Sequence, residues 1–233
     1  MHLPVHWIQA NANLKPGGFS LKQKLYFATT LLAAFLLWTV AVCLVDVAPI
    51  GPQGSAVGFA QINGAFHQMT GVHLTLYTIT DWLSLVPLGF VVGFALLGLV
   101  QWIRRRSLRK VDRSILVLGG FYGLTMAAFL FFELVAINYR PVLIEGVLEA
   151  SYPSSTTLLV LCVIPTAVMQ LNRRTKSCRL NKLLTRFLTV FSAFMVAGRV
   201  LSGVHWLSDI IGGLLLSAGL VLLYAGIIEK ADP

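Results

Sequence analysis

Long, uninterrupted runs of apolar residues constrain the fold of this chain more than any other feature. Six such runs of roughly 20 residues follow one another, separated by short polar segments. A helical run of this length spans a bilayer, whereas the soluble core of a 233-residue chain could not bury six of them. Only 12% of the residues are charged, against about 25% in average soluble domains. The sequence therefore predicts an all-α, polytopic membrane protein with six transmembrane helices.

The apolar runs also predict how the chain is divided. We expect a cytoplasmic N-terminal segment at residues 1–24 and a six-span membrane domain at residues 25–233. The stretch at residues 56–77 is too polar to cross a bilayer, so we expect it to lie at the membrane interface, where it could act as a lid or gate. The expected spans cover residues 25–47, 83–102, 115–137, 153–171, 187–200 and 210–228.

The basic residues indicate how the spans are oriented. Alternation of six spans places 16 of the 18 Lys and Arg residues on one side of the membrane, which the positive-inside rule identifies as the cytoplasm. We therefore expect a plasma membrane (bacterial inner membrane) protein with both termini in the cytoplasm. Topology explains the net charge of +9, and we expect no nucleic-acid partner. The sixteen residues are Lys15, Lys22, Lys24, Arg104, Arg105, Arg106, Arg109, Lys110, Arg113, Arg173, Arg174, Lys176, Arg179, Lys182, Arg186 and Lys230.

Arg140 and Arg199 break this pattern, because the span count places them at the outer ends of spans. A partly membrane-embedded arginine is costly and is therefore a functional candidate. The alternative is that each one reaches the lipid headgroups or pairs with an outer carboxylate such as Glu133, Glu145 or Glu149.

A histidine and an aspartate follow Arg199 at short spacing. If the segment from residue 204 is helical, His205 and Asp209 lie one turn apart on the same face. The carboxylate could then accept a hydrogen bond from one ring nitrogen and leave the other as a nucleophile.

The start of the fourth predicted span supplies hydroxyl groups and free main-chain amides at the same outer face. Residues 152–157 read Tyr-Pro-Ser-Ser-Thr-Thr, with the proline suited to a first helical turn. Such a helix start binds anions, although the same hydroxyls could simply cap the helix. Two cations, an imidazole and a helix N-terminus on one face predict an extracytoplasmic site for a phosphate ester.

The order and spacing of these residues resemble the type-2 phosphatidic acid phosphatase (PAP) superfamily of membrane lipid phosphatases. The family pattern is Lys, six residues, Arg-Pro; then Pro-Ser-Gly-His; then Ser-Arg, five residues, His, three residues, Asp. The corresponding residues here are Glu133 with Arg140-Pro141, then Pro153-Ser154-Ser155-Thr156, then Gly198-Arg199 with His205 and Asp209.

The resemblance implies a mechanism and assigns roles to these residues. His205 would attack phosphorus to form a phosphohistidine, and Asp209 would hold and polarise it. The resemblance implies no metal and no cofactor. The phosphate would be bound by Arg140, Arg199, Ser154 and the amides of the helix start around Ser155.

Three residues depart from the family pattern. Gly198 replaces a serine, Glu133 replaces a phosphate-binding lysine, and Thr156 replaces the histidine that protonates the leaving group. A threonine hydroxyl is far too weak an acid for that role. A pyrophosphate such as undecaprenyl pyrophosphate, whose leaving group is already good, is therefore favoured over a phosphate ester such as phosphatidic acid. Glu133 could itself be the acid if burial raised its pKa, or it could repel substrate or pair with Arg140; both interpretations stay open.

Two functions from different classes follow from these observations. The first is a lipid phosphatase that acts on a polyprenyl pyrophosphate or a related phospholipid through a phosphohistidine. The second is a catalytically impaired PAP-like protein that binds a phosphorylated lipid or scaffolds a membrane partner. A transporter is disfavoured, because the sequence has neither inverted repeats nor polar residues in the middle of its spans.

Overall fold

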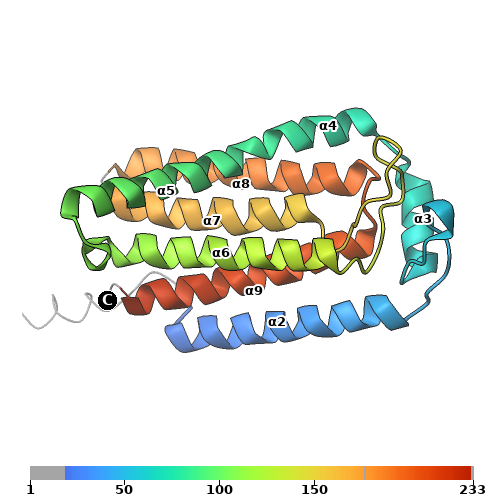
Figure 1. Ribbon diagram of the computed structural model, residues 1–233, viewed down its shortest axis with the longest axis horizontal. Coiled ribbons are helices and arrows are strands. Elements are labelled where there is room, and N and C mark those ends of the chain that lie inside the picture. Colours follow the sequence, from blue (N-terminus) through green and yellow to red (C-terminus); the bar gives the residue numbers. More distant parts are fainter. Residues whose placement is uncertain (1–18, 176, 232–233) are drawn as a thin grey trace, which may run out of the picture.

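The computed structural model describes residues 19–175 and 177–231, and the regular structure in these residues is helical. The long helices run along one axis, while α3 lies across one end of the bundle (Figure 1). The helices are α2 (Leu21–Leu44), α3 (Ala60–Thr70), α4 (Leu74–Leu83), α5 (Leu85–Arg105), α6 (Arg113–Leu134), α7 (Ser155–Arg174), α8 (Cys178–Leu201) and α9 (Leu207–Ala231), with single 3-10 turns η1 (Pro52–Gly54) and η2 (Leu108–Lys110).

In the described part of the chain, six helical segments are long and apolar enough to cross a membrane, which confirms the six-span, all-α prediction. The second of them joins α4 and α5 into 32 residues, with a turn at Ser84. Pro87 lies in the first turn of α5, where it cannot donate a backbone hydrogen bond to the turn before it. The break between α4 and α5 therefore has a local cause in the sequence.

Several helix boundaries differ from those predicted, because helix length does not follow hydropathy alone. The fifth span, predicted at residues 187–200, is the 24-residue α8. The fourth span begins at Ser155, so Pro153 precedes the helix instead of lying in its first turn. Of the predicted N-terminal segment, residues 1–18 lie outside the described part of the chain, and its last residues belong to α2, which begins at Leu21.

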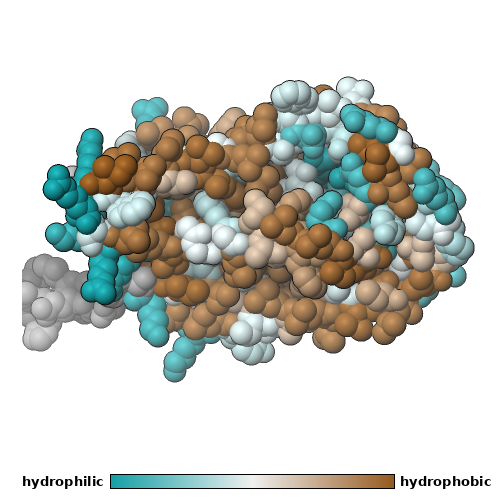
Figure 2. All heavy atoms as spheres, viewed as in Figure 1, coloured by the Kyte–Doolittle hydropathy of each residue, from teal (hydrophilic) through white to brown (hydrophobic). Residues whose placement is uncertain are grey.

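The sides of the bundle are apolar and exposed, as a surface that faces lipid requires. Leu37 on α2 is 72% exposed and Leu134 on α6 is 85% exposed. Figure 2 shows this apolar surface along the length of the molecule, with the hydrophilic residues gathered toward its two ends. The fold leaves the apolar area of these side chains uncovered, and a lipid bilayer would remove that area from water.

Helices α7 and α9 form the centre of the bundle. In the apolar stretch of each helix about half of the residues are buried, 56% in α7 and 50% in α9, against 6% in the α4–α5 segment. Glycines allow close packing on α9, because a Cβ at Gly212 would lie 2.6 Å from the Tyr152 ring and one at Gly219 would lie 2.9 Å from Leu32. The two central helices carry site residues at the end capped by α3.

Candidate active site

The predicted site residues converge at one end of the bundle, opposite the basic α5–α6 and α7–α8 loops. The α6–α7 loop, the N-terminus of α7, the α8–α9 turn and helix α4 meet there (Figure 1). The Ser154 amide donates to the Asp209 carbonyl at 3.1 Å, which joins the start of α7 to the first turn of α9. The guanidinium groups of Arg140 and Arg199 both lie over the Tyr77 ring, 5.7 and 4.8 Å from its centre.

A serine connects His205 to Asp209, and the direct hydrogen bond expected from the sequence is absent. Nδ1 of the imidazole lies 4.0 Å from Oδ2 of Asp209. The Ser151 hydroxyl lies between them, 3.1 Å from Nδ1 and 2.5 Å from Oδ2. Because a hydroxyl has one proton and Ser151 donates it to the carboxylate, the serine oxygen accepts from Nδ1–H. The remaining ring nitrogen, Nε2, therefore carries a lone pair.

His205 lies in the turn before α9 and not on the helix, so the expectation of a helix from residue 204 is wrong. The α8–α9 turn includes Gly203 at φ +67°, where a Cβ would lie 1.9 Å from the Gly71 carbonyl oxygen. Asp209 is in the first turn of α9 and accepts from the Trp206 amide at 3.0 Å. The aspartate thus caps the helix and orients the histidine through the serine.

The Asp209 carboxylate is fully buried and has several hydrogen-bond donors. Asn138 Nδ2 donates to Oδ1 at 3.1 Å, in addition to the donors Ser151 and the Trp206 amide on Oδ2. Donors of this kind stabilise a buried negative charge without a cation beside it. The sequence did not indicate Ser151 or Asn138.

Helix α3 belongs to this network, so the predicted interfacial stretch at residues 56–77 does more than lie on the membrane surface. Asn63 is 1% exposed; its Nδ2 donates to Ser208 Oγ and its Oδ1 accepts from the Ser208 amide. The Trp38 indole of α2 donates to the Ser208 carbonyl at 3.1 Å. The last part of the stretch, from Leu74, begins helix α4.

Each arginine has one carboxylate partner. Arg140 Nε lies 3.0 Å from Glu149 Oε2, one of the outer carboxylates that the sequence offered. Arg199 Nη2 donates to Asp81 Oδ1 at 2.9 Å, a partner on α4 that the sequence did not suggest. The Arg199 side chain is only 1% exposed, while that of Asp81 is 58% exposed.

Several buried polar atoms at this end have no hydrogen-bond partner, and they share the chemistry of an anion site. Buried polar groups are otherwise almost always paired, so such a cluster of donors is suited to binding a ligand. Their donors are two guanidinium groups and a hydroxyl, and the imidazole adds a lone pair. These atoms are Arg140 Nη1, Arg199 Nε and Nη1, Ser154 Oγ and His205 Nε2, while Thr157 Oγ1 on α7 and His67 Nδ1 on α3 are unpartnered as well.

The site also sets the protonation state of its histidine. Burial is the largest cause that holds the pKa of His205 well below its ordinary value, and the charges of Arg140 and Arg199 lower it further. The imidazole is therefore neutral at pH 7, with Nε2 available to attack or accept.

The structure separates the two remaining candidates. Thr156, in the first turn of α7, is 8% exposed and lines an apolar cavity. Glu133, in the last turn of α6, is exposed and borders a different, small cavity together with Ser151 and Ser155. Glu133 is therefore not buried as its role as a raised-pKa acid would require, and Arg140 pairs with Glu149 instead.

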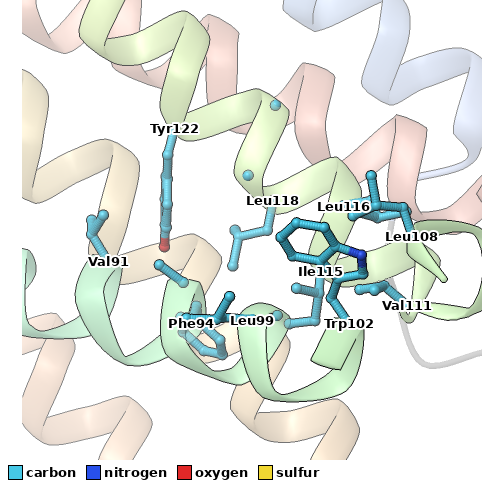
Figure 3. Close-up of a pocket in the computed structure, with 14 residues that line it drawn as sticks. Val91, Phe94, Leu99, Trp102, Leu108, Val111, Ile115, Leu116, Leu118 and Tyr122 are labelled. Atoms are coloured by element: carbon cyan, nitrogen blue, oxygen red, sulfur yellow. The ribbon is translucent and has the colours of Figure 1, made fainter. Parts of the chain in front are cut away.

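Two apolar cavities extend from the site along helices α5 and α6. The first, of about 330 Å³, is lined from Asp81 and Thr156 down to Val91 and Tyr122. The second, of about 460 Å³, shares Val91 and Tyr122 and continues to Trp102. Figure 3 shows Val91 and Tyr122 at one end of the second cavity and Trp102 and Leu108 toward the other. Within the described residues, no three His, Cys, Asp or Glu side chains are placed to hold a metal ion.

Comparisons with known proteins agree with this arrangement. The family model described as the PAP2 superfamily matches residues 120–232. A solved structure of a transmembrane PAP2-type phosphatidylglycerolphosphate phosphatase from Bacillus subtilis has the same fold, with a TM-score of 0.53 and 20% identity over 88% of this chain and 97% of that chain. Comparison with curated proteins gives no match. The matched segment contains Arg140, Ser154, Arg199, His205 and Asp209, and over residues 120–232 the chain is similar to the PAP2 superfamily.

Proposed function

We propose that this protein is a lipid phosphatase that hydrolyses a polyprenyl pyrophosphate, such as undecaprenyl pyrophosphate, or a related phospholipid. The reaction proceeds through a phosphohistidine at the extracytoplasmic face of the membrane. Its family supports phosphatase activity in general. The observation that carries the proposal is the set of unpartnered buried atoms, which includes donors from two arginines and a serine and the lone pair of His205 Nε2.

The Ser151 bridge supports His205 as the nucleophile. Nδ1–H donates to Ser151, which donates to Asp209, so Nε2 is held as the unprotonated nitrogen. When Nε2 bonds to phosphorus, the ring gains positive charge and this chain of hydrogen bonds to the buried carboxylate becomes stronger. Asp209 then stabilises the phosphohistidine without contacting it.

The remaining donors suit the phosphoryl oxygens. Arg140 Nη1 and Arg199 Nε and Nη1 are unpartnered, so each arginine keeps donors for a phosphate while one edge holds a carboxylate. The start of α7 adds the Ser154 hydroxyl and the positive end of a helix dipole. Charge developing on these oxygens in the transition state would be stabilised by groups that are already in place.

The cavities along α5 and α6 support a lipid with a long, single chain. From Leu88 to Trp102, α5 rises about 21 Å at about 1.5 Å per residue. A single leaflet provides only about 15 Å, half of a hydrocarbon core of about 30 Å. A polyprenyl chain is long enough to follow this path through both leaflets, whereas the tails of a phospholipid occupy one leaflet.

The charge distribution supports an outer-face site. Basic residues are concentrated in the α5–α6 and α7–α8 loops, at the end of the bundle opposite His205. The positive-inside rule assigns those loops to the cytoplasm. The site would then act on lipid headgroups of the outer leaflet.

The test is phosphate release by purified protein in detergent, without added metal, from undecaprenyl pyrophosphate and phosphatidic acid in parallel, with H205A as the blank. We expect turnover of the pyrophosphate and an acid-labile phosphoenzyme in the wild type, both lost in H205A. Equal turnover in H205A would overturn the role of His205. Folded wild-type protein that binds the pyrophosphate without turnover would support the alternative, a catalytically impaired lipid-binding protein.

A further inference from the structure

Asp81 lies at the junction of the anion site and the lipid cavity. One of its oxygens accepts from Arg199 at 2.9 Å, on an arginine whose other nitrogens, Nε and Nη1, are unpartnered. The same residue lines the apolar cavity together with Thr156 and Leu159. Its side chain is 58% exposed, so it can move without unpacking the core.

The packing of α4 against α8 fixes this position. Gly198 faces Thr80, and a Cβ at Gly198 would lie 2.6 Å from Thr80 Cγ2. The His73 amide, before α4, donates to the Ser202 carbonyl, after α8, at 2.9 Å. A serine at position 198, as in the family pattern, would therefore clash with the residue that precedes Asp81.

Hydrolysis of a phosphate monoester, which releases an alcohol, requires a proton donor at this junction. The leaving group carries the lipid, so its oxygen must lie between the phosphorus on His205 and the chain in the cavity. Asp81 lines this cavity and pairs with Arg199 of the anion site, and Thr156, which occupies the place of the family's proton-donating histidine, lines the same cavity. Glu133 borders a separate small cavity with Ser151 and Ser155.

We propose that Asp81 is a further catalytic residue, the carboxyl group that protonates the leaving oxygen in place of the missing histidine; this inference rests on the proposed phosphatase function. As the bond from His205 Nε2 to phosphorus forms, the bond from phosphorus to the leaving oxygen breaks. That oxygen keeps the electron pair and takes the proton of Asp81. In the second step water attacks phosphorus, the bond to Nε2 breaks, and Asp81 recovers a proton from the water.

The ion pair with Arg199 bears on how the Asp81 carboxyl group gains the proton that it donates. Without substrate, Asp81 is paired with the buried guanidinium. A phosphate that binds the unpartnered Nε and Nη1 of Arg199 brings negative charge close to the carboxylate. An anion beside a carboxyl group favours its protonated form, which is the form that can donate a proton. The charged group that faces Asp81 in the structure is Arg199, and the neighbouring Tyr77 ring covers both arginines.

The test compares two prenyl lipids with one chain and different leaving groups: undecaprenyl pyrophosphate, which releases phosphate, and undecaprenyl phosphate, which releases an alcohol. Wild-type turnover of the pyrophosphate, absent in H205A, first establishes the proposed function on its own. We then expect the wild type to hydrolyse both lipids. General acids contribute about 10²–10⁴-fold, so D81N should lose at least about 100-fold on the monophosphate and less than about tenfold on the pyrophosphate.

Two further variants complete the test. T156H in the D81N background should restore monophosphate turnover, which shows that a proton donor was missing and that the protein is folded. E145Q, an exposed carboxylate in the α6–α7 loop, is the matched control and should not change the ratio of the two activities. Equal losses on both lipids in D81N, or a gain of activity in D81N, would overturn the assignment. So would a wild type that hydrolyses the pyrophosphate but not the monophosphate, or a loss in E133Q that is confined to the monophosphate.

Discussion

Removing the Ser151 hydroxyl should slow the reaction while leaving the protein folded. In S151A, the His205 Nδ1–H loses its acceptor at 3.1 Å and Asp209 loses a donor at 2.5 Å. The distance of 4.0 Å between Nδ1 and Oδ2 is too long for the carboxylate to replace the serine directly.

The expected magnitude follows from the charge on the ring during the reaction. A hydrogen bond to a charged group contributes about 1.5–3 kcal/mol, and the imidazole is positive only once phosphorus is attached. Each factor of ten in rate corresponds to about 1.4 kcal/mol, so S151A should reduce kcat/KM by about 10- to 150-fold.

The assay is single-turnover phosphoenzyme formation, with S202A as the matched control. Ser202 is also fully buried near the site, and its hydroxyl donates only to the Arg199 carbonyl at 3.0 Å. S202A should therefore report the effect of losing a buried hydroxyl without disturbing the histidine. A loss below about threefold in S151A, or an equal loss in S202A, would refute the role of the serine bridge.

Three other perturbations have expected outcomes. The pKa of His205 is lowered in the folded protein, so below about pH 6.5 the unfolded chain binds a proton that the folded chain does not. The free energy of unfolding should therefore decrease as the pH falls through this range. Thermal unfolding at pH 7.5 and 5.5 should show a smaller decrease in Tm for H205N than for the wild type. G119L should raise KM for undecaprenyl pyrophosphate more than for a farnesyl analogue, because Gly119 lines the second cavity; G123L, at an equally open position that lines neither cavity, is the control, and equal effects would contradict the chain path. G198S should destabilise the protein by about 1–3 kcal/mol through its clash with Thr80, and T80S should reduce that loss in a thermal melt; no change in G198S would contradict the packing argument.

The six-span fold could be predicted from the sequence because it depends on a local property. A helix that satisfies its own backbone hydrogen bonds needs only enough consecutive apolar residues to cross the bilayer. Span boundaries were less accurate, because α8 continues for more than two turns through the basic segment before residue 187. That segment is helical although it is polar, so the apolar run alone underestimates the length of α8.

The spacing of His205 and Asp209 indicated a functional pair, but not the way in which they interact. The sequence argument assumed a helix from residue 204, whereas Gly203 begins an irregular turn and α9 starts at Leu207. Ser151 lies 58 residues from Asp209 in the sequence. A single serine in a loop carries no periodic signal, so its contact with the pair could be found only from the tertiary structure.

The departures from the family pattern are physically connected in this fold. Gly198 leaves room for Thr80, and Thr80 brings Asp81, 118 residues from Arg199 in the sequence, onto that arginine. With Asp81 as the proposed proton donor, the histidine that the family has at position 156 is not needed. Taken separately, each substitution suggests a weakened site. Because a serine at position 198 would clash with Thr80, the residue before Asp81, the contact of Asp81 with Arg199 depends on the glycine, and G198S should weaken the packing and the contact together.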